Sequence, residues 1–209
     1  MTTIDSMYDY YDLRAPEYDD WLLGTGLYAD LDRPGWHEEV WELERVIANL
    51  PPLSTLDVAC GTGFLTRFLR GRVAGLDQSQ RMLDIAAMRV PGGSFTVGDG
   101  LNLPYGDKSF DRVVTGHFYG HLNEEERTRF LAEAQRVASE LVIIDAALHE
   151  GVQPEEQQER RLQDGSLHQV YKRYFEPGAL ADELGGGETL HAGTWFVVVR
   201  ASLPQDGSL

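Results

Sequence analysis

The chain has 209 residues, of which 42% are hydrophobic and 25% are charged, as is typical of one globular domain with a sizeable core. Aspartate and glutamate total 34 against 18 lysine and arginine residues, and the net charge of -16 disfavours nucleic acids and anionic membrane surfaces as partners. The apolar runs are far shorter than the roughly 20 residues of a membrane-spanning helix, and the acidic N-terminus has no signal-peptide pattern. We therefore expect a cytoplasmic protein without membrane association.

The first part of the chain predicts an arm followed by alternating strands and helices. Residues 1–35 are rich in Tyr, Asp and Gly and predict a mobile arm with short helical turns. From Trp36 to Leu50 apolar residues recur at helical spacing, and two prolines end this segment. Strands are then predicted over residues 54–59, 72–77, 94–98, 110–115 and 140–146, and helices over about 62–70, 79–88 and 123–138. This alternation implies parallel strands joined by right-handed crossovers.

The last part of the chain has a different pattern. Residues 150–167 are polar and charged and predict a solvated insertion, and residues 177–184 predict a short helix. Two apolar segments separated by Gly193 then predict a hairpin. Together the elements predict an α/β fold: a three-layer, doubly wound, Rossmann-like sheet of seven strands, mostly parallel, with a C-terminal antiparallel β-hairpin.

A glycine-rich turn follows the first strand of the core. Doubly wound sheets bind ligands at the carboxyl ends of their strands, near the point where the strand order reverses. At this end the sequence reads DVACGTG over residues 57–63, and Gly61 and Gly63 would leave no Cβ between the backbone and a ligand. The alternative is a tight turn between strand and helix that binds nothing.

Three further strand ends carry residues suited to a nucleoside. Asp77 lies twenty residues after Asp57 and could accept hydrogen bonds from both ribose hydroxyls, or simply cap the helix that begins near Ser79. Asp99 could accept from an adenine amino group, although Asp99 and Gly100 could also form an ordinary turn. The mouth of the fourth strand, residues 115–117, is expected to face the same crevice.

Four motifs, in their order and spacing, resemble the class I methyltransferases that use S-adenosylmethionine (SAM). They read DVACGTG (57–63), DQSQRML (77–83), GDG (98–100) and FDRVVTGH (110–117), within a resemblance that covers residues 36–146. The segment YDLRAPEYD (11–19) is similar to the opening arm of small-molecule members of this family. The resemblance implies SAM as cofactor, S-adenosylhomocysteine (SAH) as product and a small-molecule acceptor.

The resemblance also implies which residues contact the cofactor. Asp57 would lie near the methionine ammonium, Asp77 would bind the ribose, and the arm would close over the cofactor with Arg14 near its carboxylate. For the arm, and for Met82 on its helix, plain packing is an equally good interpretation. The complete predicted set is Tyr11, Arg14, Tyr18, Asp57, Ala59, Gly61, Gly63, Asp77, Gln78, Met82, Asp99, Gly100, Leu101, Thr115 and Gly116.

Methyl transfer needs mainly alignment and exclusion of water from the protein, because the methyl donor is already a charged sulfonium and the reaction is an in-line displacement. An acceptor that must lose a proton would benefit from a base, and His117 is the candidate. His121 could instead pack or cap, while His149 and Glu150 could border the acceptor pocket. No cluster of metal ligands stands out, so no metal is expected.

The predicted single domain, residues 1–209, divides into a lid arm (1–35), a cofactor-binding core (36–146), an acceptor-side insertion (147–176) and a terminal helix and hairpin (177–203). Rival interpretations are a cofactor-binding regulator without catalysis, a methyltransferase acting on a protein, and an NAD-dependent oxidoreductase. The last is disfavoured because the loop GTGFLT (61–66) lacks the third glycine of the dinucleotide fingerprint. The acceptor and the oligomeric state stay open.

Overall fold

The computed structural model describes residues 4–204, with side chains from Asp9 onward. Nine strands and six α-helices occur in this part of the chain. The helices are α1 (Ile4–Arg14), α2 (Asp20–Leu23), α3 (Trp36–Asn49), α4 (Gln80–Arg89), α5 (Glu124–Val137) and α6 (Pro177–Glu183). The strands are β1 (Leu53–Val58), β2 (Gly71–Asp77), β3 (Ser94–Val97), β4 (Arg112–Gly116), β5 (Glu140–Ala146), β6 (Glu155–Arg161), β7 (Leu167–Arg173), β8 (Gly187–Ala192) and β9 (Phe196–Ser202).

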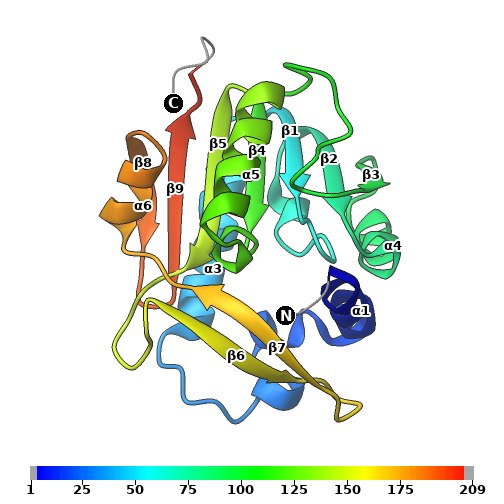
Figure 1. Ribbon diagram of the computed structural model, residues 1–209, viewed down its shortest axis with the longest axis vertical. Helices are drawn as coiled ribbons and strands as arrows, with labels where there is room; N and C mark the ends of the chain where they lie inside the picture. The colour runs from blue at the N-terminus through cyan, green and yellow to red at the C-terminus, as the bar shows by residue number, and fades with distance from the viewer. Residues whose placement is uncertain (1–3, 205–209) are drawn as a thin grey trace.

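Seven of the strands form one sheet, in the order β3-β2-β1-β4-β5-β9-β8 (Figure 1). Strands β1 to β5 pair in parallel, and β9 pairs antiparallel with both β5 and β8. The predicted mixed sheet with a terminal hairpin is therefore confirmed. The chain leaves β1 toward β2 and β3 on one side and returns to β4 on the other. The strand order thus reverses between β1 and β4, where such folds bind ligands.

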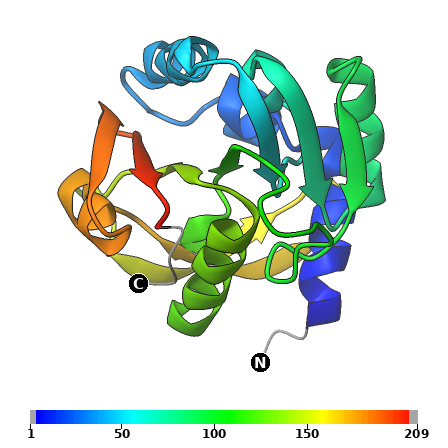
Figure 2. The ribbon, with the colours of Figure 1, turned by 90° about the horizontal axis from the view of Figure 1, so that it is seen from above.

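Apolar side chains alternate along the central strands and so build a core on each face of the sheet. In β5, Leu141 and Ile143 join the cluster that packs against α5 and α6, whereas Val142 and Ile144 join the cluster around α3. This alternation follows from the two-residue period of a strand. Figure 2 shows the result, with α3 on one side of the sheet and α5 and α6 on the other. The predicted three layers are confirmed.

The helix predicted over residues 62–70 is wrong, because this segment holds only a single 3-10 turn, Thr66–Phe68. The Thr66 hydroxyl donates to Asp57 Oδ2 (2.6 Å), which fixes the turn against the end of β1. Gly71 then begins β2 with φ of +100°. The segment between Thr66 and Gly71 is too short to form a stable α-helix.

The solvated insertion predicted over residues 150–167 is also wrong. Strand β6 begins at Glu155 and pairs with β7 in an antiparallel hairpin. Its side chains alternate between exposed and partly buried positions, as a strand requires, but both faces are polar. A hydrophobicity pattern alone therefore missed it.

The N-terminal arm and the β6–β7 hairpin pack against each other at the carboxyl ends of the parallel strands (Figure 1). The arm contains an eleven-residue helix, α1, rather than only short turns. Tyr10 of α1 clusters with Leu162 and Val170 of the hairpin, and Glu17 accepts hydrogen bonds from the Gln163 N–H. Among residues 4–204, no helix has the length and apolar character to cross a membrane.

Candidate functional site

A cavity of about 600 Å³ lies at the carboxyl ends of β1, β2, β3 and β4. We call it the first cavity. It brings together most of the residues predicted to contact the cofactor. Those that line it are Tyr11, Tyr18, Ala59, Gly61, Asp77, Gln78, Met82, Asp99, Gly100, Leu101 and Gly116. The candidate base His117 lines it as well.

The glycine-rich turn forms the floor of this cavity through left-handed backbone conformations. Ala59, Gly61 and Gly63 have φ values of 57°, 53° and 73°, a region that residues with a Cβ rarely adopt. A Cβ at Gly61 would lie 3.3 Å from the Tyr18 ring, so glycine lets the arm approach the turn. The Gly63 position is different, since a Cβ there would meet Ala86 of α4 at 3.1 Å. Gly63 therefore allows close helix packing and does not line the cavity.

Asp77 ties the turn to the neighbouring helix. Its two carboxylate oxygens accept hydrogen bonds from the N–H groups of Gly61 and Ser79, each 2.9 Å long. Burial raises the pKa of Asp77, and these two backbone donors oppose that rise. A carboxylate can accept about four hydrogen bonds, and Asp77 lines the first cavity. Ser79 is the residue that caps α4, and Asp77 holds the Ser79 N–H, so the ribose contact of Asp77 stays a prediction.

Asp99 and its neighbours form the outer wall of the cavity. Asp99 Oδ1 accepts from the Leu101 N–H (2.8 Å), which shapes the turn, and its side chain is exposed. A Cβ at Gly100 would lie 3.0 Å from both Phe118 and Val58. Gly100 thus closes the turn tightly over the end of β1. Met82 is 1% exposed and both packs in the core and lines the cavity.

Two predicted residues lie behind the cavity wall. Asp57 accepts from Thr66, and burial raises its pKa to about 7, a rise that the Thr66 hydrogen bond opposes. The Thr115 hydroxyl donates to the Val58 carbonyl (2.8 Å) and is fully buried. Thr115 does not line the first cavity. Its observed contact joins β4 to β1.

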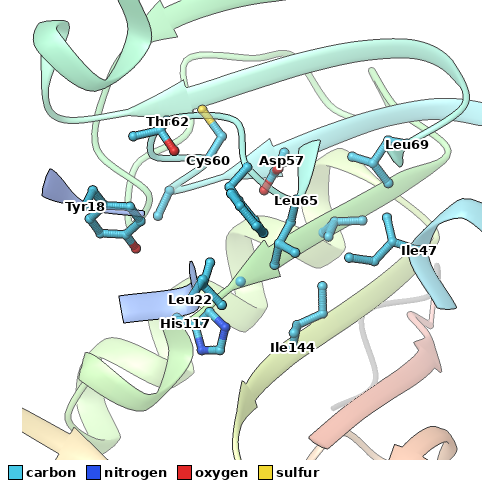
Figure 3. Close-up of a pocket in the computed structure, with 14 residues that line it drawn as sticks. Tyr18, Leu22, Ile47, Asp57, Cys60, Thr62, Leu65, Leu69, His117 and Ile144 are labelled. Atoms are coloured by element: carbon cyan, nitrogen blue, oxygen red, sulfur yellow. The ribbon is translucent and has the colours of Figure 1, made fainter. Parts of the chain in front are cut away.

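Asp57 instead borders a small cavity of about 30 Å³ beneath the turn. Figure 3 shows Tyr18, Asp57 and His117 around it, together with Leu22 of α2 and Ile144 of β5. The Cys60 thiol is buried, and its Sγ lies against Gly75 of β2. Burial raises the pKa of this thiol, so Cys60 behaves as a small apolar residue rather than a nucleophile.

A second cavity, of about 280 Å³, lies between the arm, the β6–β7 hairpin and the ends of β5 and β9. Arg14, predicted to approach the cofactor carboxylate, lines this cavity and not the first. Tyr11, Tyr18, His117 and His121 line both, so the two cavities meet at these side chains. The remaining lining residues are Trp21, Tyr28, Leu31, Arg33, Trp36, Ala146, His149, Gln158, Arg160, Lys172, Tyr174, Trp195 and Phe196.

His117 occupies the junction in a constrained conformation. Its φ is 57°, which is costly for a residue with a Cβ, and its ring packs edge-on against Trp21 at 4.8 Å between centroids. Burial lowers the pKa of His117 to about 3, so the imidazole is neutral at pH 7. Its Nε2 is buried without a hydrogen-bond partner among the described residues. A buried unpartnered nitrogen of this kind calls for a ligand or a water.

The other histidines differ from His117. His121 Nδ1 lies 2.7 Å from the Tyr171 carbonyl oxygen, which fits the packing role considered for it, and burial lowers its pKa. His149 lines the second cavity, whereas the exposed Glu150 does not. Among residues 4–204, no group of three or more His, Cys, Asp or Glu side chains is placed to hold a metal ion.

These residues fit a nucleoside joined to an amino acid. The first cavity combines carboxylates at the ends of two neighbouring strands with glycines whose missing Cβ atoms keep its walls clear. The apolar side chains of Leu76, Met82 and Leu101 line the space between them. Such a combination of flat apolar walls and a few fixed acceptors suits a purine and its ribose.

The fold is that of the class I methyltransferases that use SAM. Residues 56–141 match a family described as a methyltransferase domain, and the relatives and bound structures below support a class I SAM-dependent methyltransferase. Demethylmenaquinone methyltransferase of Thermotoga maritima is 39% identical over 132 residues, 61% of this chain and 54% of the relative. The chain spans about half the length of the curated relatives it matches first.

Solved structures agree over almost the whole chain. The complex of DhpI with SAH has a TM-score of 0.74 and 25% identity, and it covers 96% of this chain and 97% of that one. The complex of DhpI with SAM and HEP has a TM-score of 0.72 and 25% identity, with 94% and 96% covered. These ligand-bound neighbours support SAM as the cofactor and SAH as its product.

Sequence reasoning missed most of the second cavity. Arg33, Arg160 and the aromatic side chains of Trp21, Trp195 and Phe196 line it, yet they come from segments far apart in the chain. One signal was present in β6, where Glu156, Gln158 and Arg160 recur at every second position. Because all three are polar, that period is weak evidence for a strand.

Proposed function

We propose that this chain transfers the methyl group of SAM to a small-molecule acceptor bound in the second cavity. The observation that carries the proposal is the shared wall of Tyr11, Tyr18, His117 and His121 between the two cavities. A molecule in the first cavity and a molecule in the second would meet at these side chains. Methyl transfer needs such contact between donor and acceptor.

The chain's contribution is alignment and exclusion of water. When bound, SAM supplies a positively charged sulfonium whose methyl group can leave a neutral thioether behind. The arm and the hairpin close over the carboxyl ends of the strands, and burial raises the pKa of Tyr11 to about 12. The Tyr18 pKa is raised for the same reason. Both phenols therefore stay neutral at pH 7 and line the junction between the two cavities.

We expect His117 to orient the acceptor rather than to remove a proton from it. A pKa near 3 makes the imidazole a weak base, but its Nε2 is buried without a hydrogen-bond partner among the described residues, and His117 lines both cavities. We expect His117→Ala to slow methyl transfer about tenfold, less than the loss of a strong general base, and to weaken SAH binding less than it slows transfer. Equal turnover in the variant would remove His117 from the reaction.

The geometry favours a small acceptor over the rival substrates. The second cavity is bounded by both the arm and the hairpin, which leaves a chamber suited to a compact molecule. A regulator that binds SAM without catalysis would need the first cavity only. The acceptor chamber that continues from it supports an enzyme.

Calorimetric titration and a turnover assay together test the proposal. We expect heat of binding with SAH and none with NAD, followed by SAH release from SAM with one or more small acceptors but not with basic peptides. Binding of NAD in place of SAH would overturn the proposal. SAH binding without turnover across a broad panel of small acceptors would favour the regulator instead.

A further inference from the structure

The walls of the second cavity carry positive charge. Arg14, Arg33, Arg160 and Lys172 line it, and none of its lining residues is an aspartate or glutamate. This is unexpected in a chain with 34 acidic residues and a net charge of -16. The second cavity is thus a local positive site within a strongly negative protein.

One of these four charges is already compensated. The Lys172 ammonium pairs with Asp145, and both side chains are buried. Asp145 also accepts hydrogen bonds from the backbone N–H groups of Gly120 and Ala146. The charge of Lys172 is therefore compensated by Asp145, and the remaining charge belongs to the three arginines.

The most buried of the three is Arg14, at 5% exposed. Its guanidinium donates to the hydroxyls of Tyr10 (2.8 Å) and Tyr28 (3.5 Å), and it lies 4.9 Å from the centre of the Tyr18 ring. No carboxylate lies within ion-pair distance of Arg14 in the described part of the chain. Its neighbours are neutral groups, which solvate the charge without cancelling it.

Arg160 and Arg33 have equally neutral surroundings. Arg160 donates only to the Gln158 side-chain oxygen, at 3.0 and 3.3 Å. Arg33 donates to the Trp21 carbonyl at 3.0 Å and stacks 3.7 Å from the centre of the Trp36 ring. Between residues 4 and 204, neither has a carboxylate partner within 4 Å. A guanidinium has five N–H donors, so all three arginines keep donors unused.

Burying a guanidinium without a counter-charge is unfavourable unless something supplies the charge. Elsewhere this chain pairs its arginines readily, as with Arg89 and Asp19 (2.6 Å) or Arg136 and Glu133 (2.7 Å). The acids are thus available, but the second cavity has none. An anionic ligand is the simplest group that would satisfy the three arginines together.

We propose that the second cavity recognises a small organic oxyanion, with the carboxylate or phosphoryl group of the methyl acceptor held by Arg14, Arg33 and Arg160. That the anion is the methyl acceptor rests on the proposed function, whereas its binding does not. Aromatic rings of Trp21, Trp195 and Phe196 supply the rest of the wall. The ligand therefore combines an anionic end with a flat or apolar body.

The first test compares matched probes that differ in charge. Benzoate and benzamide have the same planar ring and nearly the same size, and only benzoate is an anion. We expect benzoate to bind the SAH-saturated protein at least tenfold more tightly than benzamide. Tryptophan fluorescence and calorimetry measure the two affinities. Phenyl phosphate distinguishes the two anion sources: if it binds more tightly than benzoate, the recognised group is phosphoryl, and if less tightly, carboxylate.

Neighbouring residues on β6 supply a matched pair of variants. Arg160 faces the cavity, whereas Arg161 is exposed on the other face of the strand. Both R160Q and R161Q lower the net charge equally. We expect R160Q to lose most of the preference for benzoate over benzamide, and R161Q to keep it.

Three outcomes would overturn the proposal: benzamide binding as tightly as benzoate, equal losses in R160Q and R161Q, or no measurable binding of either benzoate or phenyl phosphate. Failure of the proposed function has a different signature. If SAH does not bind while benzoate and the two variants behave as expected, the methyltransferase proposal fails and the anion site stands. Arg160 is the residue to change first, because replacing the buried Arg14 could unfold the arm.

Discussion

The two cavities are assembled from the sequence in different ways. The first is lined mainly by short segments that directly follow the strands β1 to β4, at the sheet's strand-order reversal. The second is lined by residues from the arm, from α3, from β6 and β7, and from the end of the chain. One cavity is therefore encoded by local motifs, and the other by packing between distant segments.

This difference predicts how each cavity responds to change. A substitution in a strand-end motif should alter cofactor binding and leave anion binding at the second cavity nearly intact. His117 lines both cavities, so a substitution there should affect cofactor binding and anion binding together.

The largest effect is expected for Gly61→Val. Gly61 has a φ of 53°, and a Cβ there would lie 3.3 Å from the Tyr18 ring; a β-branched residue is poorly tolerated in that conformation. We expect SAH affinity to fall by at least about 100-fold, measured by calorimetry, with a much smaller change in benzoate affinity.

Gly185→Val is the matched control for backbone strain. Gly185 also has a positive φ, 78°, but nothing lies within 4 Å of a Cβ built on it. This variant should lose some stability and keep its SAH affinity. If Gly61→Val and Gly185→Val bind SAH equally well, the turn does not shape the cofactor site.

The contrast between the cavities also explains what the sequence alone could predict. The motifs around Gly61, Asp77 and Asp99 were identifiable because each is contiguous and sits at a strand end, a place that topology brings to one edge. Arg160 was not identifiable in the same way, since its role depends on a polar strand folding back over the sheet. Residues 62–70 were misassigned because Thr66 bonds to Asp57, a tertiary contact that overrides helical pattern.

The pH dependence of stability tests the junction. Burial lowers the pKa of His117 to about 3, and Lys172, Arg160 and Arg14 add to that effect against Asp145. Below the unfolded-state pKa of about 6.5 the unfolded chain binds a proton at this histidine that the folded protein does not. His117 therefore costs stability as the pH falls from 6.5 toward 3.

His117→Asn removes this proton and tolerates the positive φ. Relative to wild type, the free energy of unfolding of the variant should shift by about 2 kcal/mol in its favour between pH 8 and pH 5, measured by urea denaturation. Taking the difference between the proteins cancels other titrating groups, including Asp57, whose raised pKa acts in the opposite direction. A difference independent of pH would mean that folding does not lower the pKa of His117.

Asp77→Ala is expected to weaken SAH binding roughly tenfold or more, from the loss of at least one charge-assisted hydrogen bond. Asp77 also holds the Gly61 and Ser79 N–H groups, so part of the loss would come from a looser turn. Asp77→Asn separates the two effects, because the amide oxygen can keep one backbone bond. Unchanged SAH affinity in a folded Asp77→Ala protein would rule out the ribose contact.

The smallest effect on binding is expected for Thr115→Val, which decides between two roles for this residue. The resemblance to class I methyltransferases implies a contact with the cofactor, whereas the Thr115 hydroxyl donates to the Val58 carbonyl behind the cavity. If that bond is its whole role, the isosteric valine should cost about 1 kcal/mol of stability and change SAH affinity by less than about twofold. A several-fold loss of affinity at unchanged stability would instead place Thr115 at the cofactor, and would mean that the wall of the first cavity moves when SAM binds.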